Sequence, residues 1–338
     1  MKIPLSVNTL ICGRLAQETI INTHKTVFIE KPGGNLLYTA YSYRLWRDAA
    51  GLAAKVGENF SEDWITEIQS HHFNTYAIKR LPVDMDVRAF YAFVGEDDFR
   101  SDNPQKYFFD LGKPFPKSLL GYTPAPAQLD NRRSGTEWSL RPEDIPGELM
   151  DCHFLYMAPL DFLSHSLIPP LFRAKSTSTV IINPAPRYMQ ASFWFDVPAL
   201  IQGSTAVITT LNRANKLFLG RDRDMWGMAE TLATFGVEIV VITAGADGQY
   251  LYERDSRKKY HIPAYPAEIV DTVCASDAFG GGFLAGYTTH FDPLQAALMG
   301  NISASIKVEG STPDYLLHAM PELAQARLEN LQSRVQEC

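Results

Sequence analysis

Short β-branched runs alternate with helical patterns in the C-terminal half of the chain. Residues 237–243 form a continuous apolar run, which is typical of a strand buried on both faces of a parallel sheet. The preceding residues 224–235 have helical spacing and stop at Gly236, a residue that favours the end of a helix. Strands that alternate with helices predict an α/β fold with right-handed crossovers. Runs of the same strand type lie at residues 153–157, 179–182 and 206–209.

The N-terminal half has the same alternation. Residues 6–12 are β-rich and end at Gly13, as a central strand that leads into a loop would. Residues 35–48 have helical spacing and follow Gly33 and Gly34, which let the backbone approach a ligand closely. The long stretch 100–146 is rich in Pro and Gly and predicts irregular loops that contain short helices or strands. Further elements are expected at 26–30, 52–57 and 87–94 as strands and at 61–69 and 321–335 as amphipathic helices.

Composition and charge restrict the class of protein. With 338 residues, 46% hydrophobic and 20% charged, the chain has an ordinary globular composition. Its net charge of −7 argues against nucleic acid as the main partner. No run approaches the length of a membrane span, so no membrane partner is expected, and residues 1–12 resemble a first strand more than a signal peptide. The four cysteines form no CxxC pair, which favours free thiols in a reducing cytoplasm.

The richest candidate chemistry lies at residues 271–283, where small residues separate a predicted strand end from a predicted helix. The first N–H groups of a helix have no partner within it and carry the positive end of its dipole, so they stabilise an anion. Asp277 falls in the first turn, where a carboxylate can accept a proton from an attacking hydroxyl. The alternative is a tight turn in which Asp277 is only a helix cap.

The same stretch resembles the signature of the ribokinase-like (PfkB) carbohydrate kinase family, Asp-Thr-x-Gly-Ala-Gly-Asp-Ala-Phe followed by glycines. Cys274 and Ser276 stand where that family has glycines. The resemblance implies that Asp277 is the catalytic base. It also implies that the backbone amides of Cys274, Ala275 and Ser276, leading to Asp277, form an anion hole for the transferring phosphoryl group.

On the substrate side, residues 13–20 resemble the family's Gly-x-x-x-x-Asp-x-Ile. Glu18 occupies the position of an Asp that binds substrate hydroxyls, and the alternative for it is a solvated surface glutamate. The resemblance implies that Gly33 and Gly34 line the substrate pocket. Tyr38 stands where the family has Asn, so a substrate other than plain ribose, or a differently shaped pocket, is expected.

On the nucleotide side, the resemblance implies ATP and Mg²⁺ as cofactors. Asn212 and Asn215 resemble the family's Asn-x-x-Glu, which helps to hold magnesium and its water shell, although Asn215 lacks the charge of the Glu. No side chain is assigned as a direct metal ligand. The remaining nucleotide-binding candidates are Thr243, Gly245 and Gly248, which resemble Thr-x-Gly-x-x-Gly, and Asn301 on the adenine side. Each of these nucleotide-side assignments has a structural alternative: a helix cap for Asn212, a plain strand-to-hairpin turn for residues 243–248, and helix packing for Asn301.

Together these features predict a single α/β domain over residues 1–338, with a three-layer αβα ribokinase-like fold. A central, mostly parallel sheet is expected, with a small β lid from segments at approximately 14–32 and 75–95. The implied activity is ATP-dependent phosphorylation of a hydroxyl on a sugar, polyol or nucleoside-like small molecule, and the resemblance allows a homodimer through the lid.

Two alternatives remain open. One is a ribokinase-fold protein without kinase activity that binds a ligand or a partner. The other uses the same base for a different reaction on a phosphorylated or carboxylated molecule. Departures from the family pattern favour the first alternative, and retention of Asp277 favours the kinase; the departures are Glu18, Tyr38, Asn215, Cys274 and Ser276.

Overall fold

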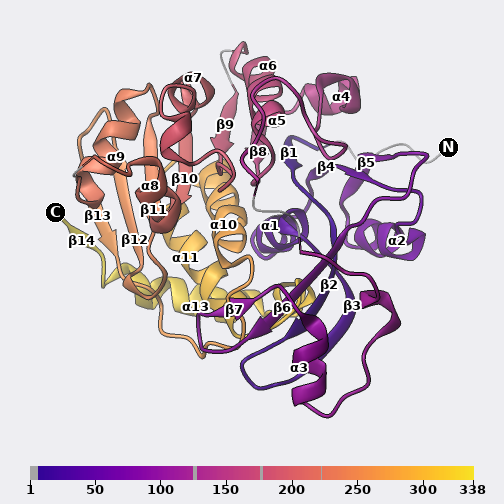
Figure 1. Ribbon diagram of the computed structural model, residues 1–338. Helices are drawn as coiled ribbons and strands as arrows, with labels where there is room; N and C mark the ends of the chain where they lie inside the picture. The colour runs from indigo at the N-terminus through magenta and orange to yellow at the C-terminus, as the bar shows by residue number, and fades with distance from the viewer. Residues whose placement is uncertain (1–6, 125–127, 176–177, 222) are drawn as a thin grey trace.

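The computed structural model describes residues 7–124, 128–175, 178–221 and 223–338. Its main element is a ten-stranded sheet that runs across the molecule (Figure 1). Seven neighbouring strands are parallel, and the last three along one edge are antiparallel. The strand order is β14 (Gln336–Glu337), β13 (Lys259–Ile262), β12 (Gln249–Glu253), β11 (Ile239–Thr243), β10 (Ala206–Thr210), β9 (Thr179–Ile182), β8 (Phe154–Met157), β1 (Thr9–Cys12), β4 (Gly51–Val56) and β5 (Asn74–Arg80).

Helices cover both faces of this sheet, which confirms the predicted αβα layering. Because successive residues of a strand point to opposite faces, Val240 packs in one apolar cluster and Val241 in the other. One layer contains α1 (Asn35–Arg44), α2 (Glu62–Ser70), α10 (Ala275–His290), α11 (Pro293–Val308), α12 (Asp314–Leu317) and α13 (Pro321–Gln332). The other contains α4 (Gly147–Met150), α5 (Phe162–Leu167), α6 (Pro169–Arg173), α7 (Val197–Ile201), α8 (Leu211–Leu217) and α9 (Met225–Thr234).

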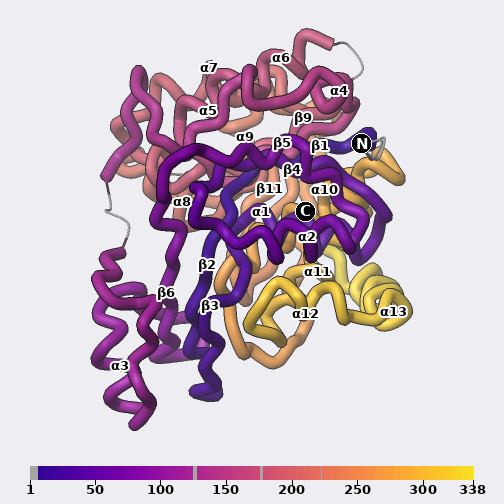
Figure 2. The backbone as a smooth tube through the Cα atoms, turned by 90° about the vertical axis from the view of Figure 1, so that its right-hand side faces the viewer, coloured from indigo at the N-terminus to yellow at the C-terminus, as the bar shows by residue number. Residues whose placement is uncertain are grey.

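A second, four-stranded sheet projects from the main body as a lid (Figures 1 and 2). Its order is β3 (Val27–Gly33), β2 (Ala16–Ile21), β6 (Arg88–Phe93) and β7 (Phe99–Arg100). The helix α3 (Pro104–Asp110) packs on it through Phe108 and Phe90. The expected lid segment 75–95 differs from this arrangement in its first part, because β5 pairs in parallel with β4 at the edge of the main sheet.

The lid is attached to the main body beside the glycine-flanked motif. The turn between β2 and β3 places Thr23 against the residues before the motif, where its amide donates to Val270 O at 3.1 Å and its hydroxyl lies 3.1 Å from Ile269 O. At the other end, Asp97 of the β6–β7 turn approaches Gly245. The lid therefore contacts the residues before the motif, and its β6–β7 turn lies close to Gly245. Among the described residues, no helix has the length and apolar character needed to cross a membrane.

Candidate active site

The candidate base is fixed at the start of α10, which packs unusually closely on its neighbours. A Cβ at Gly280 would lie 1.7 Å from the Tyr156 hydroxyl, and one at Gly281 would lie 2.1 Å from the carbonyl oxygen of Thr39. The Thr39 hydroxyl donates to the carbonyl oxygen of Asp277 at 3.2 Å. The glycines therefore let α10 seat against α1 and β8, which holds Asp277 at the carboxyl edge of the sheet.

The main chain around the start of α10 offers free N–H groups. The amide of Ala275 donates to Thr272 O at 3.2 Å, and that of Asp277 donates to Cys274 O at 3.0 Å. The amides of Cys274 and Ser276 have no acceptor among the residues that the structure describes. Two of the predicted anion-hole donors are thus free at the positive end of a 16-residue helix, and two are used within the turn.

Cys274 adopts the left-handed backbone conformation that glycine adopts most easily, with φ = 56°. This conformation costs a residue with a side chain about 1–2 kcal/mol relative to its right-handed alternative, whereas glycine adopts it without that cost. The strain follows from the backbone course of the turn that leads into α10.

We therefore expect Cys274→Gly to be more stable than Cys274→Ala by about 1 kcal/mol, because alanine removes the thiol but keeps the strain. Urea unfolding of the two variants measures this difference. Equal midpoints and slopes for both variants would contradict the assignment of strain to this residue.

Asp277 is buried, with 5% of its surface exposed, and its surroundings set its acidity. Burial raises the pKa of its carboxyl to about 6, while the Arg213 guanidinium and the Cys274 thiol oppose that rise. A carboxylate with a pKa in this range is well suited to general-base catalysis near neutral pH. Sequence reasoning identified Asp277 and the backbone amide of Cys274, but neither Arg213 nor the effect of the Cys274 thiol on this pKa.

Three residues from neighbouring strand ends form a polar network with Asp277. The Asn183 side-chain nitrogen lies 3.5 Å from Asp277 Oδ1, the upper limit of a hydrogen bond, and 3.3 Å from the Tyr156 hydroxyl. Arg213 Nη1 donates to Asn183 Oδ1 at 2.6 Å. Sequence reasoning missed Asn183 and Arg213, although Asn183 directly follows a predicted strand and Arg213 lies a few residues beyond the end of another.

Glu18 is buried with 1% exposure, so the alternative of a solvated surface glutamate is wrong. Its two carboxyl oxygens accept hydrogen bonds of 2.9 Å from the Gly34 amide and from the Tyr38 hydroxyl. Burial raises the pKa of Glu18 to about 7, and these two hydrogen bonds oppose the rise. A Cβ at Gly33 would lie 2.2 Å from this carboxyl group. The structure thus brings together the four predicted substrate-side residues Glu18, Gly33, Gly34 and Tyr38.

A buried ion pair lies at the start of the stretch 271–283. Lys307 of α11 and Asp271 are both fully buried. The Lys307 ammonium donates to Asp271 O at 2.7 Å, to Asp271 Oδ1 at 2.9 Å and to Gly310 O at 3.3 Å. The same oxygen, Oδ1, also accepts a hydrogen bond from the Val273 amide at 2.7 Å and so stabilises the turn. The ion pair therefore joins the end of α11 to the backbone that leads into α10.

The predicted nucleotide-side residues occupy two neighbouring strand ends. Asn212 and Asn215 are exposed on α8, which Thr210 caps. Gly245 and Gly248 both have positive φ in the turn after β11, next to Thr243. Asn301 is buried, and its side-chain amide forms hydrogen bonds with the Gln249 side chain, the Pro263 carbonyl and the Tyr265 backbone amide. A direct role of Asn301 at the adenine stays a prediction.

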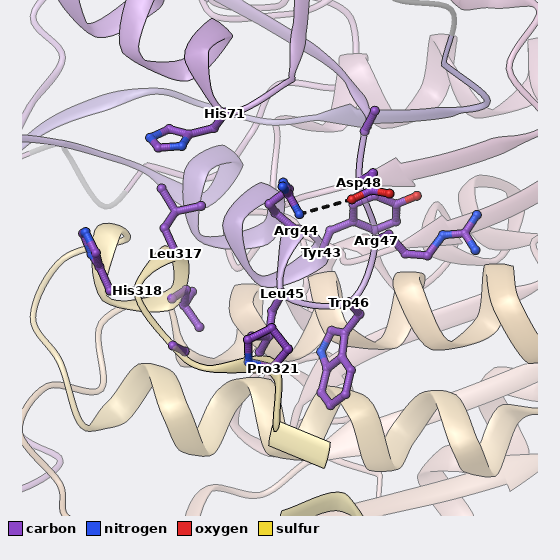
Figure 3. A pocket seen from close by; sticks show the side chains of 13 residues that line it. Tyr43, Arg44, Leu45, Trp46, Arg47, Asp48, His71, Leu317, His318 and Pro321 are labelled. Atoms are coloured by element: carbon purple, nitrogen blue, oxygen red, sulfur yellow. Dashed lines mark hydrogen bonds and ion pairs between the residues drawn. The ribbon is translucent and has the colours of Figure 1, made fainter. Parts of the chain in front are cut away.

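A cavity of about 900 Å³ lies at the other end of α1 (Figure 3). Arg44, Trp46 and Asp48 line it from α1 and the residues that follow, and His71 and His318 from other segments. None of the predicted site residues lines this cavity. This cavity is therefore separate from the polar network around Asp277.

Comparisons with known proteins agree with the resemblance seen in the sequence. Residues 172–319 match the model of the pfkB family of carbohydrate kinases. A cytidine kinase from Thermococcus kodakarensis is 24% identical over 263 residues, which are 77% of this chain and 81% of that protein. A ribokinase from Staphylococcus aureus is 25% identical over 180 residues, 52% of this chain and 57% of that protein.

Solved structures show the same fold. A structure described as ribokinase II from E. coli with ATP and Mg²⁺ has a TM-score of 0.69 at 14% identity, covering 96% of this chain and 100% of that one. A nucleoside kinase from Burkholderia thailandensis in complex with inosine has a TM-score of 0.65 at 17% identity, covering 96% of this chain and 98% of that one. The predicted ribokinase-like fold is confirmed.

Proposed function

We propose that this chain, whose residues 172–319 match the pfkB family of carbohydrate kinases, is a small-molecule kinase that transfers the terminal phosphoryl group of ATP to a hydroxyl of a sugar, polyol or nucleoside, with Asp277 as the general base. One observation carries this proposal. A buried carboxylate lies in the first turn of α10, and the free amides of Cys274 and Ser276 lie in the same turn. A base and an anion site side by side are what phosphoryl transfer to a hydroxyl needs.

In the proposed reaction, Asp277 accepts the proton of the attacking hydroxyl. The amides of Cys274 and Ser276 stabilise the charge on the transferring phosphoryl group. Glu18 and Tyr38 bind the acceptor: each carboxyl oxygen of Glu18 accepts one hydrogen bond within the protein and has the capacity to accept another from a hydroxyl of the substrate. The lid sheet covers the acceptor and excludes water from the reaction.

Magnesium would supply charge neutralisation at the phosphates. The side chains of Asn212 and Asn215 fit a role around it, because both are exposed on α8 and their amide oxygens have no partner in the described part of the chain. An amide oxygen accepts a hydrogen bond from metal-bound water. Thr243, Gly245 and Gly248 then form the turn against which the ATP phosphates lie.

The pH dependence of the proposed reaction follows from the acidity of Asp277. Since the base must be ionised, kcat should rise with pH through the pKa of Asp277, near pH 6, and level off above it. Below that pH it should fall about tenfold per unit. Steady-state kinetics between pH 4.5 and 8.5 measure this limb. A limb at the ordinary value for an aspartate, close to 4, would contradict the buried base.

The proposal is tested by incubating the protein with ATP and Mg²⁺ and a panel of sugars, polyols and nucleosides. Mass spectrometry detects the phosphorylated acceptor, and a reaction without acceptor measures background ATP hydrolysis. Phosphorylation of at least one acceptor above that background is expected. Calorimetric binding of an acceptor and ATP without any transfer would instead favour the non-catalytic, ligand-binding alternative.

A further inference from the structure

The side chain of Asn183 has an orientation that its own contacts decide. Arg213 Nη1 donates to Asn183 Oδ1 at 2.6 Å and to Pro184 O at 3.1 Å. A guanidinium only donates hydrogen bonds, so the amide oxygen of Asn183 must face Arg213. The amide nitrogen then faces the Tyr156 hydroxyl at 3.3 Å and Asp277 Oδ1 at 3.5 Å.

This orientation matters because the two ends of an amide have nearly the same shape but opposite hydrogen-bonding character. An NH₂ group that faces Asp277 stabilises the ionised carboxylate, the form that accepts a proton. Turned by half a rotation, Asn183 would present its oxygen and stabilise the protonated carboxyl group. Packing alone does not distinguish these two orientations of the amide. A hydrogen-bond donor on the side of Asn183 away from Asp277 is therefore needed to select one of them.

The network is held by four elements that meet at the carboxyl edge of the sheet. Asn183 follows β9, and its backbone N–H donates to Met157 O at 2.8 Å. Arg213 lies in the first turn of α8, where its amide donates to the Thr210 hydroxyl at 3.2 Å. The titratable or charged groups that face Asp277 are Arg213 from α8, Tyr156 from β8 and Cys274 from the turn before α10.

We propose that Arg213 is a positioning residue that locks the Asn183 amide with its NH₂ group toward Asp277. Its kinetic consequence rests on the proposed function, whereas the amide orientation is a property of the free protein. A lysine at this position would keep the lock, because its ammonium also only donates. A glutamine would not, because it can donate or accept.

The test compares Arg213→Lys, Arg213→Gln and Arg213→Met with Lys216→Met, an exposed residue on the same helix. Two measurements are made on each: the acidic limb of kcat against pH, and the titration of the Asp277 carboxyl by ¹³C NMR, assigned with Asp277→Asn. Arg213→Lys and Lys216→Met should match the unsubstituted protein. The Gln and Met variants should move both readouts upward by about one pH unit and lower kcat at pH 6 by up to about tenfold.

Loss of the positive charge of Arg213 could by itself move the titration, so the lock needs a double-mutant cycle. In an Asn183→Ala background, Arg213→Met should shift the Asp277 titration by much less, because there is no amide to orient. An equal shift in both backgrounds would mean that the guanidinium acts only by its charge, and would overturn the lock. So would a higher KM for ATP with an unchanged pH profile, which would mean that Arg213 binds the nucleotide.

The two proposals fail separately. If no acceptor is phosphorylated, the proposed function falls, yet the NMR titration still decides the orientation of Asn183. If phosphorylation is found and the Gln variant titrates like the unsubstituted protein, the function stands and the lock falls. Thermal unfolding of every variant verifies that the fold is kept.

Discussion

Asp277→Asn is expected to lower kcat by about 10²–10⁴-fold, the usual contribution of a general base. The asparagine keeps the shape of the side chain and loses only its ability to take the proton. Steady-state kinetics with saturating ATP and acceptor measure the loss. A matched control is Asp255→Asn, which replaces an exposed aspartate in the β12–β13 turn and should leave kcat unchanged.

The same variant separates a catalytic role from a structural one. Burial raises the folded-state pKa of Asp277 above its ordinary value, so the ionised carboxylate destabilises the folded protein at neutral pH. Replacing it by a neutral amide should therefore leave the free energy of unfolding at pH 7 unchanged or higher. If kcat fell because the protein unfolds, or if kcat stayed within threefold of the original, Asp277 would not be the base.

Lys307→Met is expected to have the largest effect on stability, lowering the free energy of unfolding by about 3–5 kcal/mol. Both partners of the Lys307–Asp271 pair are fully buried, so the substitution leaves the Asp271 charge without its partner. Urea unfolding measures the loss. Lys259→Met, which breaks the partly exposed pair with Glu230, is the control and should cost about 0–1 kcal/mol.

The loss should depend on pH in a defined direction. Burial raises the pKa of Asp271, and Lys307 opposes that rise, so removing Lys307 raises the folded-state pKa further. An acid with a raised folded-state pKa destabilises the fold as the pH increases. The deficit of Lys307→Met should therefore be smaller at pH 5 than at pH 8. A deficit below 1 kcal/mol at both values would mean that the pair contributes little to the fold.

The sequence by itself determined the layered fold and the position of the motif. Strand runs such as 237–243 and helical spacing such as 224–235 each report which faces of one element are buried, and that is local information. The junction at 271–283 could likewise be located because small residues and an aspartate follow a strand end directly. The resemblance added the roles that local patterns do not state, and the comparisons matched residues 172–319 to the same family.

Only the tertiary structure decided which side chains meet. Asn183 and Asp277 are 94 positions apart, and Asn183 and Arg213 are 30 apart, so no period or motif links them. Lys307 gave a faint signal, as a charged residue in a helix otherwise rich in small and apolar residues, but its partner could not be read from the pattern. Similarly, the sequence alone was compatible with a solvent-exposed glutamate at position 18. The structure shows that this side chain is buried and hydrogen-bonded to Tyr38. The physical reason is that hydrophobic periodicity fixes the buried face of each element, whereas hydrogen bonds at the sheet edge depend on how separate elements are placed against one another.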